Sequence, residues 1–344
     1  MIANLISSIA EEQTLKPPFG DGYLFEAKRF NYNWQYARLD FNLFTSLSVL
    51  FSLELYKKEL SAYETELVKL KENVLKLLPA YQKNAEHQSF NFYPKGKNFH
   101  FAPGNVLKYI QKLKLPDDID DSALAYYCFG KDAGDWTTFK SEALKRISAD
   151  GIYDTWLGTN MPKEYDLCTL CNFLLTVHNQ EKGFKSEIDL RNVSFVIDKI
   201  IAKEYLNRPF WTARHYGNTA MIIHHFARLA YHTRDPIFTK AALKVLKDIP
   251  EILENTPSKG QQTLMHSSGL MLALYTNTHF EVHISAAFEK SFYSFIGSPF
   301  AALSVPLSTV MAASPLYWLK YKCTAHEYAL HIENLILLSH YEAR

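Results

Sequence analysis

This sequence of 344 residues has few glycines, few cysteines and almost no net charge. Its 13 glycines form neither a Walker-type phosphate loop nor a G-x-G-x-x-G dinucleotide loop, and no G-x-S-x-G nucleophile elbow occurs. The sequence therefore lacks the usual signals of nucleotide binding and of serine hydrolases. A net charge of +1, from 37 basic and 36 acidic residues dispersed along the chain, argues against a nucleic-acid partner.

Four cysteines are too few to form a disulfide framework in a chain of this length. Cys168 and Cys171 form one C-x-x-C pair, but no second pair completes a zinc site, and both lie in an apolar helical pattern that is typical of buried cysteines. The stretch nearest to a membrane span, residues 301–319, contains two prolines, and residues 1–15 lack the features of a signal peptide. We therefore expect a cytoplasmic protein without a transmembrane segment.

Apolar residues recur at spacings of three and four along most of the chain, which is the period of amphipathic helices. Hydrophobic residues make up 47% of the sequence, enough for a large core. The pattern predicts an all-α protein of about a dozen helices in antiparallel hairpins, forming one domain over residues 1–344 with residues 1–30 as an N-terminal extension. Such helices fit a closed (α/α)6 toroid, and an open helical-repeat solenoid is the alternative. The predicted helices are 2–14, 35–56, 61–78, 106–113, 122–129, 137–147, 163–178, 187–205, 218–234, 236–249, 261–277, 285–296 and 324–341.

The most unusual stretch has four aspartates within five residues, Asp117, Asp118, Asp120 and Asp121, directly after Pro116 and before an apolar helical pattern. Helix capping accounts for one or two of them, because an N-cap contributes ~1 kcal/mol and further negative charge at the helix start adds ~0.5 kcal/mol. Crowding combined with burial would raise the pKa of at least one carboxyl group and keep it protonated near neutral pH, as a general acid requires. A solvated acidic cap and a Mg²⁺ site completed by a phosphate are the alternatives.

The segment Asp118-Ile119-Asp120-Asp121-Ser122-Ala123 matches a D-x-D-D-[ST]-A signature and resembles the class II terpene cyclases, which share (α/α)6 toroids with prenyltransferase-like proteins. The resemblance implies an apolar, isoprenoid substrate whose alkene or epoxide is protonated by Asp120, while Asp118 and Asp121 hold its geometry and protonation, without a metal. The chain lacks the repeated Q-x5-W pattern of this family and is long enough for one toroid only. Since the family places its site between two toroids, the resemblance implies a partner domain or a homo-oligomer.

Other functions are consistent with the same residues. The run from Asp117 to Asp121 also satisfies the D-D-x-x-D motif of class I terpene synthases, which would require Mg²⁺, although Pro116 indicates a helix start and no second metal motif is found. Glycoside hydrolases on (α/α)6 toroids pair carboxylates with aromatic platforms, and Asp132, Asp135 or Asp154 could supply the partner carboxylate. A non-catalytic toroid that binds a ligand or a protein is the third alternative.

Aromatic and polar residues around the cluster are expected to line the pocket. Aromatic residues make up 14% of the sequence, which suits an apolar pocket with polar-tipped walls. Residues 214–218 open a helix where an anion could sit, and the adjacent His224 and His225 would point about 100° apart on a helix, too far to chelate one metal easily. The candidate substrate-binding residues are Asp117, Phe99, Phe101, Trp136, Trp156, Asp166, Asn172 and Tyr216.

Overall fold

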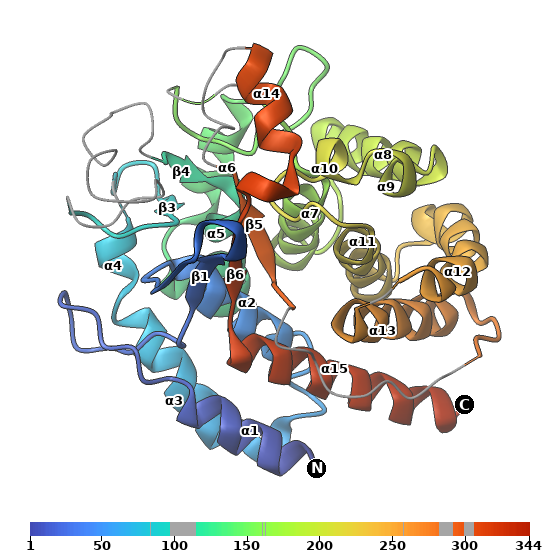
Figure 1. The fold of residues 1–344 in the computed structure, drawn as a ribbon, viewed down its shortest axis with the longest axis horizontal. Helices are drawn as coiled ribbons and strands as arrows, with labels where there is room; N and C mark the ends of the chain where they lie inside the picture. The colour runs from blue at the N-terminus through green and yellow to red at the C-terminus, as the bar shows by residue number, and fades with distance from the viewer. Residues whose placement is uncertain are drawn as a thin grey trace.

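Six helices pack against one another in a closed cyclic order in the computed structural model (Figure 1). The model describes residues 1–82, 84–96, 115–159, 161, 163–256, 258–281, 292–298 and 306–344. Each helix of the series contacts the next, and the last contacts the first. In order, these ring helices are α2 (Leu43–Glu54), α5 (Ile119–Phe129), α7 (Leu167–Glu181), α11 (Thr219–Thr233), α13 (Lys259–Thr276) and α15 (Thr324–Glu342).

A second set of helices packs on the outside of the ring (Figure 1). The two sets differ in sequence as their positions require. Helix α11 is buried on every side from Ala220 to Tyr231, whereas the outer helix α12 buries a stripe and exposes Lys240 and Lys247. The outer helices are α1 (Ile2–Glu11) on α15, α3 (Glu64–Leu75) on α2 and α5, α8 (Glu187–Ile201) on α7, and α12 (Thr239–Glu254) on α11 and α13.

Shorter helices connect these elements. None of the helices in the described ranges has the length and apolarity needed to cross a bilayer. The connecting α-helices are α4 (Leu78–Tyr81), α6 (Trp136–Leu144), α9 (Glu204–Asn207), α10 (Pro209–Thr212) and α14 (Pro306–Ala313), and the 3₁₀ turns are η1 (Tyr32–Trp34), η2 (Ser61–Tyr63), η5 (Gly130–Asp132), η6 (Pro236–Phe238) and η7 (Pro315–Tyr317).

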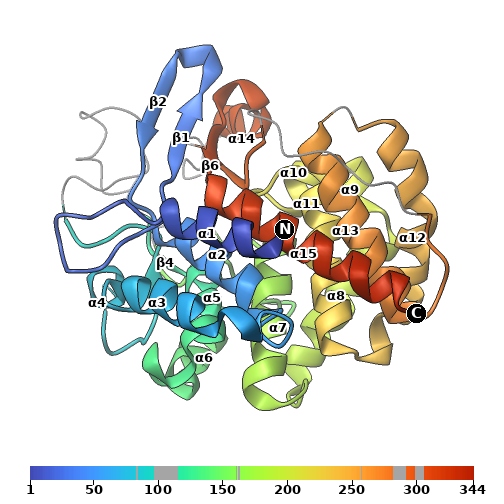
Figure 2. The same cartoon turned by 90° about the horizontal axis from the view of Figure 1, so that it is seen from below.

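A small antiparallel sheet, which the sequence pattern did not predict, joins segments far apart in the chain. Its strands lie in the order β2 (Tyr36–Leu39), β1 (Lys28–Asn31), β6 (Leu319–Lys322) and β5 (Phe295–Gly297). The β1–β2 hairpin projects from the helices (Figure 2). A separate two-stranded sheet pairs β3 (Phe90–Asn91) with β4 (Asp117–Asp118) and so ties an aromatic loop to the aspartate cluster.

The mostly helical architecture predicted from the sequence is confirmed, with local corrections. The helix predicted for residues 35–56 begins only at Leu43, because residues 36–39 pair with β1 as a strand. Residues 295 and 296 of the helix predicted for 285–296 are part of β5, and the rest of that prediction falls largely outside the described residues, as does all of the helix predicted for 106–113.

Four of the six ring helices begin with a side-chain cap that fixes where the helix starts. Asn42 caps α2, Asp118 caps α5, Asp166 caps α7 and Asn218 caps α11, each accepting a hydrogen bond from a backbone N–H of the first turn. The positive ends of these helix dipoles therefore point toward one end of the ring, where they favour negative charge. The candidate site lies at that end.

Candidate functional site

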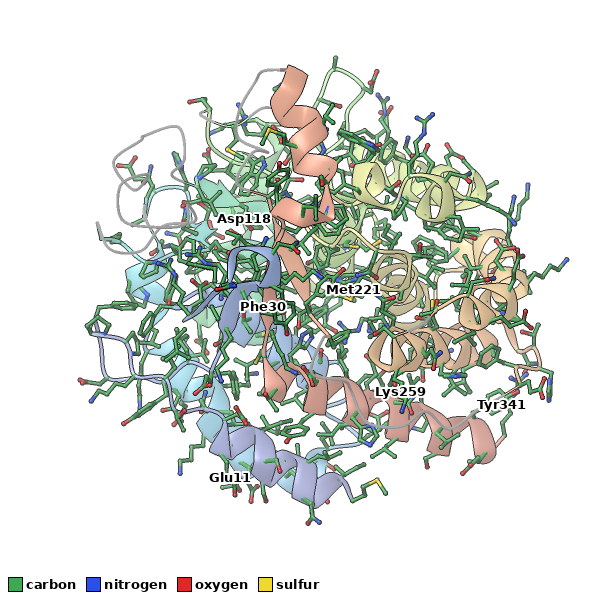
Figure 3. The ribbon with its side chains drawn as sticks, in the orientation of Figure 1. Glu11, Phe30, Asp118, Met221, Lys259 and Tyr341 are labelled. Atoms are coloured by element: carbon green, nitrogen blue, oxygen red, sulfur yellow. The ribbon has the colours of Figure 1, made fainter. Side chains whose placement is uncertain are left out.

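A pocket opens where the ring helices start, and it encloses about 730 Å³ of space outside protein atoms, including open solvent at its mouth. Phe44 from α2, Thr169 from α7 and Tyr216 just before α11 reach it, and Tyr321 enters from β6. Asp118 lies where β4 joins α5 (Figure 3). The remaining walls are formed by Phe92, Leu115, Asp120, Asp121, Thr155, Trp156, Met161, His215, Phe295, Ile296, Gly297 and Ser298.

Asp118 and Asp121 form a coupled carboxyl pair on the pocket wall. Oδ1 of Asp118 accepts a hydrogen bond of 2.7 Å from the backbone N–H of Asp121, and both side chains are buried. Burial raises the pKa of Asp118 to about 7, against the lowering effect of its side-chain hydrogen bond with Asp121. Burial and the charge of Asp118 raise the pKa of Asp121 well above its usual value. The pair therefore holds at least one proton at neutral pH.

Asp120 points to a different set of partners from those of the coupled pair. Its Oδ2 accepts hydrogen bonds from the hydroxyl of Tyr216 at 2.7 Å and from Oγ1 of Thr169 at 3.0 Å, and its Oδ1 accepts one from Nδ2 of Asn172 at 2.9 Å. Burial raises the pKa of Asp120, while these three hydrogen bonds oppose the rise. The environment thus disfavours a charge through desolvation, yet it provides donors that stabilise the carboxylate when it forms.

A histidine, His215, borders the aspartates. Its Nε2 lies 3.2 Å from Oε1 of Glu164, whose other oxygen lies 2.6 Å from Nη1 of Arg214. Burial alone would lower the pKa of His215, but the hydrogen bond and charge of Glu164, with Asp166 and Asp118, raise it overall. A protonated His215 offsets part of the negative charge of the cluster.

Trp156 and Asp166 reach this site through backbone interactions. The loop that carries Trp156 runs beside β4, with a backbone bridge between Trp156 and Asp118, and the indole Nε1 donates to Glu164 at 2.8 Å. Asp166 caps α7 with one oxygen and accepts the backbone N–H of His215 at 2.8 Å with the other. Burial raises the pKa of Asp166 to about 6.

The structure brings most, but not all, of the predicted residues together. Asp118, Asp120, Asp121, Trp156 and Tyr216 line the pocket, Asn172 contacts Asp120, and Asp166 supports His215.

Asp117 accepts hydrogen bonds from Ser89 and Asn91 and does not line the pocket. Trp136 packs against Tyr126 and Phe139 and donates to Glu181, also away from the pocket. Phe99 and Phe101 lie outside the described residues.

The acidic residues considered as glycosidase partners are placed elsewhere. Asp132 and Asp135 are exposed, and Asp135 caps α6. Asp154 is engaged by Arg146 at 3.2 Å and by the backbone N–H groups of Trp156 and Glu164. These three side chains therefore do not provide a second carboxylate in the pocket.

Several pocket residues were not predicted from the sequence. Thr169 had a usable signal, because it follows the cap Asp166 by three residues and precedes Asn172 by three, which places it on the same helix face. The aromatic residues Phe44, Phe295 and Tyr321 had none, because they come from the start of α2 and from two strands that meet only in the folded chain.

The residues of the cluster do not fit a Mg²⁺ ion. Both oxygens of Asp120 already accept hydrogen bonds, from Tyr216, Thr169 and Asn172. Among the residues that the structure describes, no group of three or more His, Cys, Asp or Glu side chains is arranged to hold a metal ion. We therefore derive no step through a metal.

No known protein family model, curated protein or solved structure matches this chain.

Proposed function

We propose that this chain is a terpene-cyclase-like enzyme that protonates an alkene or epoxide of an apolar, isoprenoid substrate. The observation that carries the proposal is the environment of Asp120, a buried carboxyl group on the wall of an aromatic-lined pocket that receives three hydrogen bonds and lies beside a carboxyl pair sharing a proton. A solvated acidic helix cap would have neither the burial nor these donors.

Asp120 serves as the acid in this proposal, with Asp118 and Asp121 controlling its protonation. Burial raises the pKa of Asp120 and so favours its neutral form, and the adjacent pair of Asp118 and Asp121 holds a further proton. In an alkene the π electrons take the proton of Asp120 and form a new C–H bond, whereas in an epoxide an oxygen lone pair takes it, forming an O–H bond as a C–O bond of the ring breaks. Either step leaves a carbocation on the substrate and a carboxylate at Asp120. The hydrogen bonds from Tyr216, Asn172 and Thr169 stabilise that carboxylate as it forms.

Aromatic rings around the pocket suit the carbocation that results. The ring centroids of Phe44 and Phe295 are 4.7 Å apart, and Phe295 stacks on Tyr321 at 4.2 Å. The faces of such rings attract cations, more strongly where water is excluded. The same apolar lining favours an isoprenoid over a carbohydrate, whose hydroxyl groups would require more polar partners.

We also propose that the cyclic arrangement of helices is an (α/α)6 toroid. Its support is the closed order of ring helices together with the outer helices that pack on them. A cytoplasmic location is proposed in keeping with the four cysteines, all of them free and buried. A second copy or a partner domain would cover the open end of the pocket.

The decisive experiment is to incubate the purified protein with a panel of isoprenoids, including terminal alkenes, epoxides and diphosphate esters, with and without EDTA. We expect turnover that EDTA does not abolish, and an Asp120→Asn variant that loses at least about a hundredfold in kcat while its thermal melt is retained. Asp135→Asn, an exposed helix cap outside the pocket, is the matched control. Unchanged turnover in Asp120→Asn would overturn the acid role. If no isoprenoid gives a product, the proposed reaction is refuted and a ligand-binding scaffold is the remaining alternative.

A further inference from the structure

A second chamber lies deeper among the ring helices, behind the wall that carries Asp120. It has room for about one water-sized group. Phe44 and Tyr216 line both spaces, and Asn172, which donates to Asp120, lines the chamber. Met221, in the first turn of α11, also lines it (Figure 3). The polar groups of the chamber are His224, His225, Arg228, His326, Ser48 and Ser294.

The imidazole of His326 has unused hydrogen-bonding capacity in this chamber. Its Nδ1 lies 2.7 Å from Oγ of Ser294, while its Nε2 has no hydrogen-bond partner among the described residues. The residue is only 5% exposed, so bulk water does not satisfy this atom. A buried polar atom without a partner costs free energy, which makes it a candidate for binding a ligand atom.

The charges around the chamber cancel. Nε of Arg228 donates to Oε2 of Glu333 at 2.9 Å, and Nε2 of His224 lies 3.1 Å from the other oxygen of Glu333. Burial lowers the pKa of His326 to about 3 and that of His225 well below its usual value, so both are neutral at physiological pH. A neutral imidazole can both donate and accept a hydrogen bond. Neither a free anion nor a free cation would find an uncompensated counter-charge here.

We propose that this chamber binds the neutral oxygen, a hydroxyl or a carbonyl, at one end of a ligand whose apolar chain extends past Tyr216 into the pocket at Asp120. The inference deepens the proposed function and rests on it for the identity of the chain. The chamber has room for about one water-sized group and so accepts the oxygen alone, while Phe44 and Tyr216, which line both spaces, border the apolar chain. His326 is the residue that distinguishes such an oxygen from a methyl group.

Two probes of similar length test this inference, farnesol and the hydrocarbon farnesene, titrated against the protein and followed by intrinsic tryptophan fluorescence. We expect the wild-type protein to bind farnesol about tenfold more tightly, the gain from one buried hydrogen bond. His326→Leu should remove this preference. His326→Asn, which keeps an amide near Ser294, should reduce it to about threefold and serves where the leucine variant does not fold. His331→Leu, a change on the same helix outside the chamber, should leave it intact.

The outcomes test the binding of an oxygen in the chamber independently of the proposed reaction. Equal binding of the two probes by the wild-type protein, or a preference for farnesol that survives in folded His326 variants, overturns the inference even if isoprenoids are turned over. A preference for farnesol that requires His326, in a protein that converts no isoprenoid, supports the chamber and refutes the proposed reaction.

Discussion

Replacing Asp118 by asparagine should make the stability of this protein less sensitive to pH. The folded pKa of Asp118 is about 7, against an ordinary value of 3.8. Between these two values the folded state binds more protons than the unfolded state, so the free energy of unfolding falls as the pH rises. At 1.36 kcal/mol per pH unit, the full titration removes roughly 4 kcal/mol, more than half of it between pH 5 and pH 8.

Asparagine retains the side-chain oxygen that caps α5 but does not titrate. Urea unfolding at a series of pH values, followed by circular dichroism, should therefore show that the wild-type protein loses roughly 2–3 kcal/mol more than Asp118→Asn between pH 5 and pH 8. Asp135→Asn is the matched control, because it changes another aspartate cap whose pKa is lowered by hydrogen bonds from Thr138 and Thr137. Parallel pH dependences for the wild-type protein and Asp118→Asn would refute the raised pKa of Asp118.

Three further substitutions probe other parts of the argument. Tyr216→Phe removes the donor nearest to Asp120 and should lower kcat roughly tenfold, with KM little changed, in steady-state assays with whichever isoprenoid is turned over. Arg228→Met removes the guanidinium that pairs with the buried carboxylate of Glu333 and should cost roughly 3–5 kcal/mol in urea unfolding, most of which the added change Glu333→Leu should restore. Gly269→Ala should lower the free energy of unfolding by roughly 1–3 kcal/mol, because the new Cβ would lie 2.2 Å from the ring of Phe280. Alanine normally favours helices, so an unchanged thermal melt would contradict this packing.

The helices were predictable because their signal is local. The 3.6-residue period and the cap residues are contained within each segment, so α5 begins within a few residues of its predicted start, after Pro116 and at the cap Asp118. The sheet was not predictable in this way. Its strands are three or four residues long, and Lys28 pairs with Lys322, a partner that no local pattern identifies.

The residues of the candidate site were likewise predictable only where they are close together in the sequence. The aspartate cluster stood out because its residues are adjacent in the sequence, whereas the donors to Asp120 come from α7 and from the turn before α11. Proximity in the sequence also misled: Trp136 lies only fifteen residues after Asp121, but it packs against Tyr126 and Phe139 and does not line the pocket. The cyclic order of the helices is what assembles the pocket.

The position of α15 in the ring has a consequence for how the protein is made. Helix α15 packs between α13 and α2, and the strand before it, β6, pairs with β1. During translation these residues leave the ribosome after all the other ring helices, so the apolar faces of α2 and α13 stay uncovered until then. Long-range pairing of this kind slows folding and prolongs the exposure of aggregation-prone surface. The yield of folded protein should therefore depend on chaperones that hold the nascent chain until α15 emerges.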